Sequence, residues 1–157
     1  MWKNIVIEYM RVLIGDLDCL STYEDTRLER VAVISAFQVL NEINTDTTYT
    51  VNILTGSLSP DPSTLDTPDN TFINLIALKS SYLIISGELR AAAMSNVSVV
   101  DGPSTISMAG RSQSLQKLAS DLQSRYELAK FLYQSGQAGQ AITTPSTVTS
   151  IYPIQDF

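Results

Sequence analysis

The chain has 157 residues, a formal net charge of −6 at pH 7 and a single cysteine, Cys19. This length suits one domain with one hydrophobic core, and a single cysteine excludes an intrachain disulfide framework. The acidic balance disfavours tight binding to phosphate backbones, which requires clustered Lys and Arg side chains.

The first predicted element is a short amphipathic helix over residues 2–17. Its apolar residues recur at the helical spacings of three and four: Trp2, Ile5, Val6, Tyr9, Met10, Leu13 and Leu17. Glu8 and Arg11 interrupt the apolar run and no small-residue cleavage pattern follows, so the segment does not resemble a signal peptide. We expect Gly15, Asp16 and Asp18 to end the helix, and we expect synthesis and folding in a cytoplasm.

A second helix is predicted from about Thr22 to Ile43, with Thr22 and Asp25 as a capping box. One stripe of small residues permits close approach to another helix, and its members are Leu28, Ala32, Ser35, Ala36, Val39 and Ile43. A second apolar side, formed by Val33, Phe37 and Leu40, predicts a second packing partner.

Charged residues cluster at the start of this helix: Glu24, Asp25, Arg27, Glu29 and Arg30. Charges three and four residues apart form local pairs on a helix, so the cluster is typical of a solvated face. The alternative is one side of a contact between subunits, for which Arg27, Glu29 and Arg30 are the candidate interaction residues.

Residues 47–54 alternate apolar and polar side chains and are rich in β-branched residues, which predicts a short strand. Three prolines and many small polar residues follow between Gly56 and Pro68, which predicts an exposed loop without regular structure. Thr67 and Pro68 are then the expected N-cap and first-turn residue of the next helix.

That next helix, residues 70–94, is the most apolar stretch and is apolar on nearly every side, so we expect it to be the buried centre of a bundle. A membrane span is the competing interpretation. Asn74 and Lys79 fall inside the run, and Glu88 and Arg90 close it, so the uncharged length is shorter than the roughly twenty residues that a bilayer requires.

Two β-branched runs joined by Asp101-Gly102-Pro103 predict a β-hairpin over residues 96–109. The last helix is predicted over residues 110–134, with a polar face opposite one apolar stripe. The stripe consists of Leu115, Leu118, Ala119, Leu122, Tyr126, Ala129 and Tyr133.

From residue 135 to 157 the chain is rich in Gly, Ser, Thr and Pro, which predicts a flexible arm. Its end is apolar again at Ile151, Tyr152, Ile154 and Phe157. Residues 147–157 are therefore a candidate docking strand that adds to an exposed sheet edge of another subunit. A frayed terminus is the alternative interpretation.

Together these elements predict a mainly α protein, a bundle of about four helices with a small β element near residues 47–54 and 96–109. The bundle forms one domain over residues 1–134, and the extended arm follows it. Without histidine, His-based triads and His-ligated metals are excluded. We interpret the aspartates at 16, 18, 61, 66 and 69 as solvated turn residues, because none has a calcium-loop spacing. No catalytic, cofactor or metal residue is predicted, and we expect no enzyme.

Three stretches resemble the head-to-tail connector (adaptor, or head-completion) proteins in the neck of tailed bacteriophages. Residues 11–43 resemble their opening, with the motif Tyr-x-Asp-x-x-Leu at Tyr23, Asp25 and Leu28 before an alanine-rich helix. Residues 70–84 and 99–129 resemble the later helices and the intervening hairpin, particularly in phages with contractile tails.

The resemblance implies a structural virion protein without cofactor. Copies are expected to form a ring, commonly twelvefold, that binds the portal protein and links the capsid to the tail or stopper proteins. DNA would pass through this ring without specific binding, and no membrane would be involved. Two alternatives stay open: a tail-completion or tail-terminator protein, which is usually built on a sheet, and a non-virion cytoplasmic helical adaptor or regulator.

Overall fold

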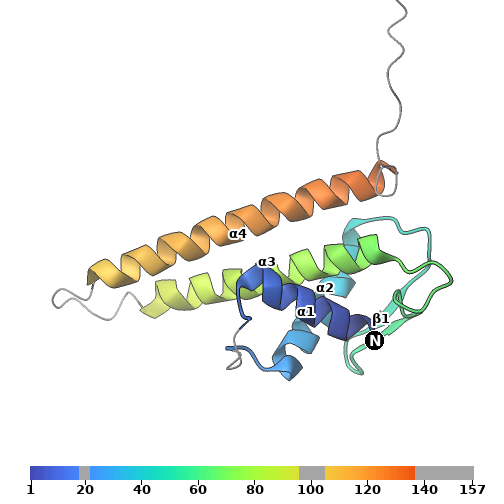
Figure 1. Ribbon diagram of the computed structural model, residues 1–157, viewed down its shortest axis with the longest axis horizontal. Helices are drawn as coiled ribbons and strands as arrows, with labels where there is room; N and C mark the ends of the chain where they lie inside the picture. The colour runs from blue at the N-terminus through green and yellow to red at the C-terminus, as the bar shows by residue number, and fades with distance from the viewer. Residues whose placement is uncertain (18–21, 96–104, 137–157) are drawn as a thin grey trace, which may run out of the picture.

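The computed structural model describes residues 1–17, 22–95 and 105–136. Its elements are α1 (Trp2–Ile14), α2 (Asp25–Glu42), β1 (Thr50–Asn52), β2 (Ser57–Ser59), α3 (Asn70–Ser95) and α4 (Thr105–Gln134). Helix α3 is central, because α1, α2 and α4 each pack against it (Figure 1). The predicted helical bundle with a small β element is thus confirmed, whereas residues 137–157 of the predicted arm lie outside the described part of the chain.

Helix α1 buries Trp2, Val6, Ile7 and Met10 and ends three residues earlier than the predicted Leu17. Gly15 adopts a left-handed conformation with φ 74°, which glycine tolerates and which turns the chain away from the helix. The following Asp16 is buried, forms an ion pair with Arg11, and accepts a hydrogen bond of 2.8 Å from the backbone N–H of Thr22. The prediction that Asp16 is solvated was therefore wrong.

The predicted capping box of α2 was also wrong. Glu24 is the N-cap and makes no side-chain capping bond. The Thr22 N–H, which a capping box would pair with the Asp25 carboxylate, donates to Asp16 instead. The predicted small-residue stripe is confirmed, and its six residues are all buried. Of the second apolar side, Val33 is buried but Phe37 remains 44% exposed, so the neighbours of α2 cover that side only in part.

Strands β1 and β2 form an antiparallel pair with Val51 opposite Leu58. The predicted strand is confirmed at three residues, but the prediction of an irregular exposed loop fails at Ser57–Ser59. Gly56 has φ 64° and reverses the chain, so the residues after it pair with β1. Leu58 and Pro62 are then buried, because this pairing folds the segment back against α2 and the core.

The N-terminus of α3 is capped by Asp69 and not by Thr67. The carboxylate of Asp69 accepts hydrogen bonds from the Phe72 N–H at 2.9 Å and from the Tyr49 hydroxyl at 3.0 Å, two bonds that a threonine hydroxyl at position 67 does not make. The Tyr49 ring stacks on Phe72 with centroids 4.5 Å apart. These contacts fix the β1 segment to the start of the central helix.

Residues Asn70–Met94 of α3 are long and apolar enough to cross a membrane by length and composition, with a mean hydropathy of 1.3. Within the bundle, however, this helix is the core. Its most buried side chains are Phe72, Leu75, Ile76 and Ala77. Ser80 and Ser81 are buried too, and each donates its hydroxyl to the carbonyl four residues earlier.

Helix α4 begins at Thr105, so the prediction of a strand through residues 105–109 was wrong, while residues 96–104 of the predicted hairpin lie outside the described residues. A helix satisfies its hydrogen bonds within one segment, whereas two isolated strands are marginal. The predicted apolar stripe is confirmed: Ala119, Leu122 and Tyr126 are buried, and the other stripe residues pack against the core in part.

The bundle has two unlike ends along its long axis (Figure 1). At the closed end, α1 and α2 pack on the first half of α3, and the β1–β2 pair packs on α2. At the open end, α3 and α4 continue together past α1 and α2. No residue of 86–94 or 112–118 is buried, so the open end has a thin core of half-buried side chains.

Candidate functional site: a groove between helix α2 and the β1–β2 turn

A groove of about 540 Å³ lies at the closed end, between α2, the start of α1 and the turn that joins β1 to β2. Its apolar wall includes Ile34, Ile53 and Leu54, and its charged wall is formed by Lys3, Glu29 and Arg30. The apolar side chains are open to water: Ile34 is 40% exposed, Ile53 47% and Leu54 98%. Such a combination is typical of a binding surface, because a folded chain otherwise buries clustered large apolar groups.

Local backbone geometry holds the turn in place. The side-chain oxygen of Asn52 accepts hydrogen bonds from the backbone N–H groups of Leu54 at 3.0 Å and Thr55 at 3.2 Å. This arrangement keeps Leu54 at the tip of the turn. Gly56 closes the turn next to Lys3, and a Cβ atom added at Gly56 would lie 3.5 Å from the Lys3 ammonium.

The structure separates the three predicted interaction residues of α2. Glu29 and Arg30 line the groove, where Lys3 lies 3.4 Å from the Glu29 carboxylate. Arg27 points elsewhere, to Glu88 of α3 at 3.4 Å and over the Tyr23 ring. The prediction of local pairs within this helix was therefore wrong for Arg27 and Glu29, which pair with other helices.

Arg30 is exposed and forms no ion pair with any residue that the structure describes. The other predicted interaction residues, Ile151, Tyr152, Ile154 and Phe157, lie outside the described ranges. The groove thus contains one free cation beside an uncovered apolar wall.

A second cluster, which we call the Glu42 junction, joins three helices and was not predicted. The Glu42 carboxylate, at the end of α2, accepts hydrogen bonds from Lys79 of α3 at 2.6 Å and from Tyr126 of α4 at 2.7 Å, and Lys130 lies 3.4 Å away. Gln134 donates to the Glu42 backbone carbonyl at 3.1 Å. Both ammonium groups also lie over the Tyr126 ring, at 4.6 and 5.3 Å from its centroid.

Electrostatics at the junction stabilise the ionised carboxylate. Burial alone would raise the pKa of Glu42, but the hydrogen bonds from Lys79 and Tyr126 and the two ammonium charges hold that pKa below its ordinary value. Burial and the neighbouring Glu42 raise the pKa of Tyr126, which stays neutral and donates. These side chains bond to one another across α2, α3 and α4, so the junction acts as a clamp that fixes α4 to the end of α2.

One feature of the sequence indicates a buried ion pair at this position. Lys79 interrupts an otherwise apolar helix, and a buried lysine requires an anionic partner. The partner was not identifiable, because Glu42 is 37 residues away from Lys79 and 84 from Tyr126.

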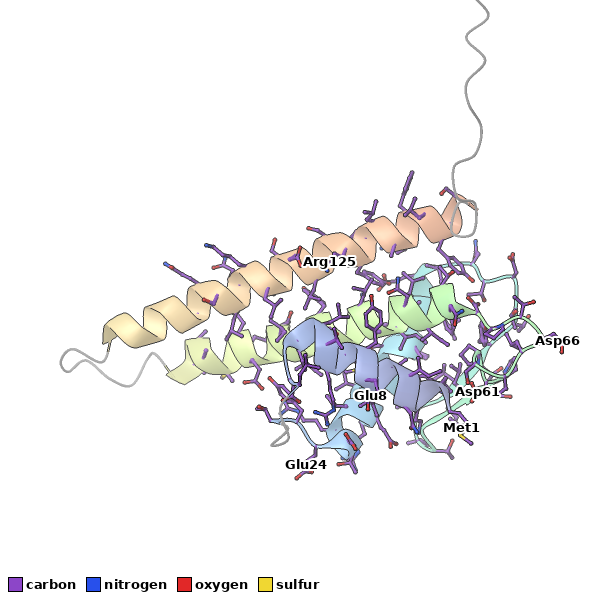
Figure 2. All side chains as sticks on the ribbon, viewed as in Figure 1. Met1, Glu8, Glu24, Asp61, Asp66 and Arg125 are labelled. Carbon is purple, nitrogen blue, oxygen red and sulfur yellow. The ribbon has the colours of Figure 1, made fainter. Side chains whose placement is uncertain are left out.

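The aspartates after β2 and before α3 are also structural. Asp61 accepts hydrogen bonds from the Ser63 backbone and hydroxyl and from the Trp2 N–H, so it lies beside the N-terminus of α1 (Figure 2). These bonds outweigh the effect of burial and hold the pKa of Asp61 below its ordinary value. The interpretation of Asp61 and Asp69 as solvated turn residues was therefore wrong, whereas Asp66 is exposed.

A second hollow, of about 670 Å³, lies where α4 ends, and Thr47, Asp69, Tyr133 and Gly136 are among its lining residues. Burial, together with the charges of Asp69 and Asp46, raises the pKa of Tyr133 to about 12. The hollow places the last described residue of the chain beside the segment that leads from α2 into β1.

Two helices present further large apolar side chains to solvent. On α1, Ile5, Tyr9 and Val12 are 48%, 39% and 58% exposed and, at spacings of four and three, they lie along one face. On α4, Leu128 and Phe131 are 60% and 65% exposed. These two outer faces are separate, because α1 and α4 pack on α3 without contacting each other.

Within the described ranges, no group of three or more His, Cys, Asp or Glu side chains is arranged to hold a metal ion. The groove supports a binding surface, and the Glu42 junction and the aspartates at 61 and 69 support structural clamps. Comparisons with protein families, curated proteins and solved structures find no match to this chain.

Proposed function

We propose that this protein is a structural subunit of the head-to-tail connector of a tailed bacteriophage, forming an adaptor ring that binds the portal and links the capsid to the tail. The role requires no catalysis and no cofactor. The observation that carries the proposal is the pair of exposed apolar faces on α1 and α4, together with the resemblance of residues 11–43, 70–84 and 99–129 to connector proteins.

A closed ring is built from head-to-tail contacts, in which each subunit uses two different and complementary faces. The α1 face, with Ile5, Tyr9 and Val12, and the α4 face, with Leu128 and Phe131, meet this requirement, since they lie on different helices and are both uncovered. We infer that the α1 face of one subunit packs on the α4 face of the next.

The charge of the chain suits a conduit for DNA. A net charge of −6 repels phosphate, so a genome passes such a wall without adhering to it. The mainly helical fold, with strands of only three residues, favours a connector over a tail terminator, which is usually built on a sheet.

Electron microscopy of the purified protein mixed with portal rings from the same phage tests the proposal. We expect a new ring of density below the portal. Portals that stay bare would contradict the connector role. In that case, presence of the protein in purified virions would indicate a tail-side subunit, and its absence would indicate a cytoplasmic adaptor or regulator.

Variants of the two faces test the inferred contact. Tyr9→Glu on α1 and Phe131→Glu on α4 each place a charge in one face, and we expect each to prevent ring formation. Mixing the two variants should give a heterodimer and no ring, because each variant keeps the face that the other lacks. Asn4→Glu and Gln123→Glu, at exposed positions of the same two helices, are the matched controls that should leave ring formation unchanged.

A further inference from the structure

The groove beside Leu54 lacks an occupant among the described residues, although its apolar wall faces water. We propose that in the free subunit this groove binds the C-terminal segment of the same chain, residues 151–157. This proposal concerns the isolated subunit and does not rest on the connector role.

The chemistry of the segment matches the two walls of the groove. Side chains of an extended peptide alternate in direction, so an extended segment bound in the groove would present Tyr152, Ile154 and Asp156 on one side. Two apolar groups then face the apolar wall, and one carboxylate is available to the free guanidinium of Arg30. Residues 137–157 contain no Lys or Arg, so no like charge opposes Arg30.

The segment is close enough to reach the groove of its own chain. The last described residue, Gly136, shares a hollow with Thr47. Thr47 is seven residues before Leu54, which separates them by at most about 25 Å. Residues 137–150 allow the chain to span up to about 50 Å from Gly136 to Ile151. The end of α4 and the β1–β2 pair also lie at the same end of the bundle (Figure 1).

Tethering favours the chain's own groove over that of a second copy. A linker of this length keeps the segment at an effective concentration of about a millimolar, above the concentration of other free subunits in a dilute sample. Pro153 lacks a backbone N–H and interrupts any continuous strand ladder. We therefore assign the contact to side chains in the groove and not to an additional strand on β1 or β2.

Photocrosslinking of the full-length chain tests this assignment. The photoreactive residue p-benzoylphenylalanine replaces Leu54, whose side chain is 98% exposed and therefore not needed for folding. We expect a crosslink from position 54 to residues 151–157 at the mass of one chain. The same replacement at the exposed Leu128 of α4 is the control and should give no such crosslink. A product of twice the mass, or crosslinks elsewhere only, would overturn the proposal.

The charge pairing is tested in the same experiment. Arg30→Asp should lower the yield of the crosslink several-fold, and Asp156→Arg should do the same. Combining the two changes restores an opposite pair and should recover most of the yield. Equal crosslink yields in the unchanged chain, the two single variants and the double variant would show that Arg30 and Asp156 do not pair. The crosslinking experiment uses the free subunit. A negative crosslinking result would therefore not contradict the proposed ring, and a negative result with portal rings would not contradict the proposed contact in the groove.

Discussion

The two ends of the bundle differ in how many elements surround α3. At the closed end, α1, α2 and α4 all pack against it, and Phe72, Leu75 and Ile76 are completely buried. At the open end, α3 and α4 continue past α1 (Figure 1), and α2 reaches α3 there through the Arg27–Glu88 ion pair; residues 86–94 and 112–118 contain no buried side chain. This contrast indicates that the closed end supplies most of the stability of the subunit, while the open end and the outer faces of α1 and α4 stay largely uncovered.

The largest expected loss of stability comes from removing a buried side chain at the closed end. Phe72→Ala removes a fully buried ring that stacks on Tyr49, and we expect it to lower the free energy of unfolding by about 3–5 kcal/mol. Leu89→Ala, in the open end, is the matched change and should cost about 1 kcal/mol or less, because that side chain is only half-buried. Urea denaturation measures both values, and equal losses would contradict the contrast.

The Glu42 junction should give the next largest effect. Glu42→Gln removes the charge that pairs with Lys79, whose side chain is only 14% exposed, and we expect a loss of about 1–3 kcal/mol at pH 7. Glu8→Gln, an exposed change on α1 (Figure 2), is the control and should have almost no effect.

The pH dependence of stability gives an independent reading of the same junction. The folded pKa of Glu42 lies below its ordinary value of 4.5. Its contribution is therefore fully present above pH 4.5 and is lost as the pH falls through the folded pKa. Denaturation curves from pH 7 to 3 should show the wild type approaching Glu42→Gln in stability. A constant difference across this range would exclude the carboxylate charge as the cause.

The smallest expected effect is an increase in the free energy of unfolding. The Ser35 hydroxyl is buried in the α2 stripe and has no hydrogen-bond partner within the described residues. An unsatisfied buried hydroxyl is costly, so Ser35→Ala should raise the free energy of unfolding by about 1 kcal/mol. Ser81→Ala is the control, because the Ser81 hydroxyl is bonded to the Ala77 carbonyl, and it should give no such gain. Thermal denaturation distinguishes the two variants.

Periodicity predicted the elements whose signal is local. The stripes of α2 and α4 and the all-round apolar α3 follow from side chains three and four residues apart, and their burial agrees with those patterns. The features that failed depend on contacts between distant residues. Asp69 caps α3 while holding Tyr49 from another segment, and β2 forms because Gly56 returns the chain to β1.

The candidate groove was predictable only in part. Glu29 and Arg30 were selected from the charge cluster of α2, but nothing in the sequence places Ile53 and Leu54 beside them. That placement depends on the turn between β1 and β2 and on its packing against α2. The Glu42 junction was missed for the same reason, because its members come from three helices.

The most direct test is hydrogen–deuterium exchange, measured on the free subunit and on the subunit mixed with portal rings. It tests whether the closed end stabilises the fold and whether the outer faces bind other subunits. In the free subunit, amides of residues 72–85 should be protected, and those of 89–95 should exchange at least about tenfold faster. Addition of portal rings should slow exchange in α1 and α4. Equal protection along the whole of α3, with no change when portals are added, would contradict this account.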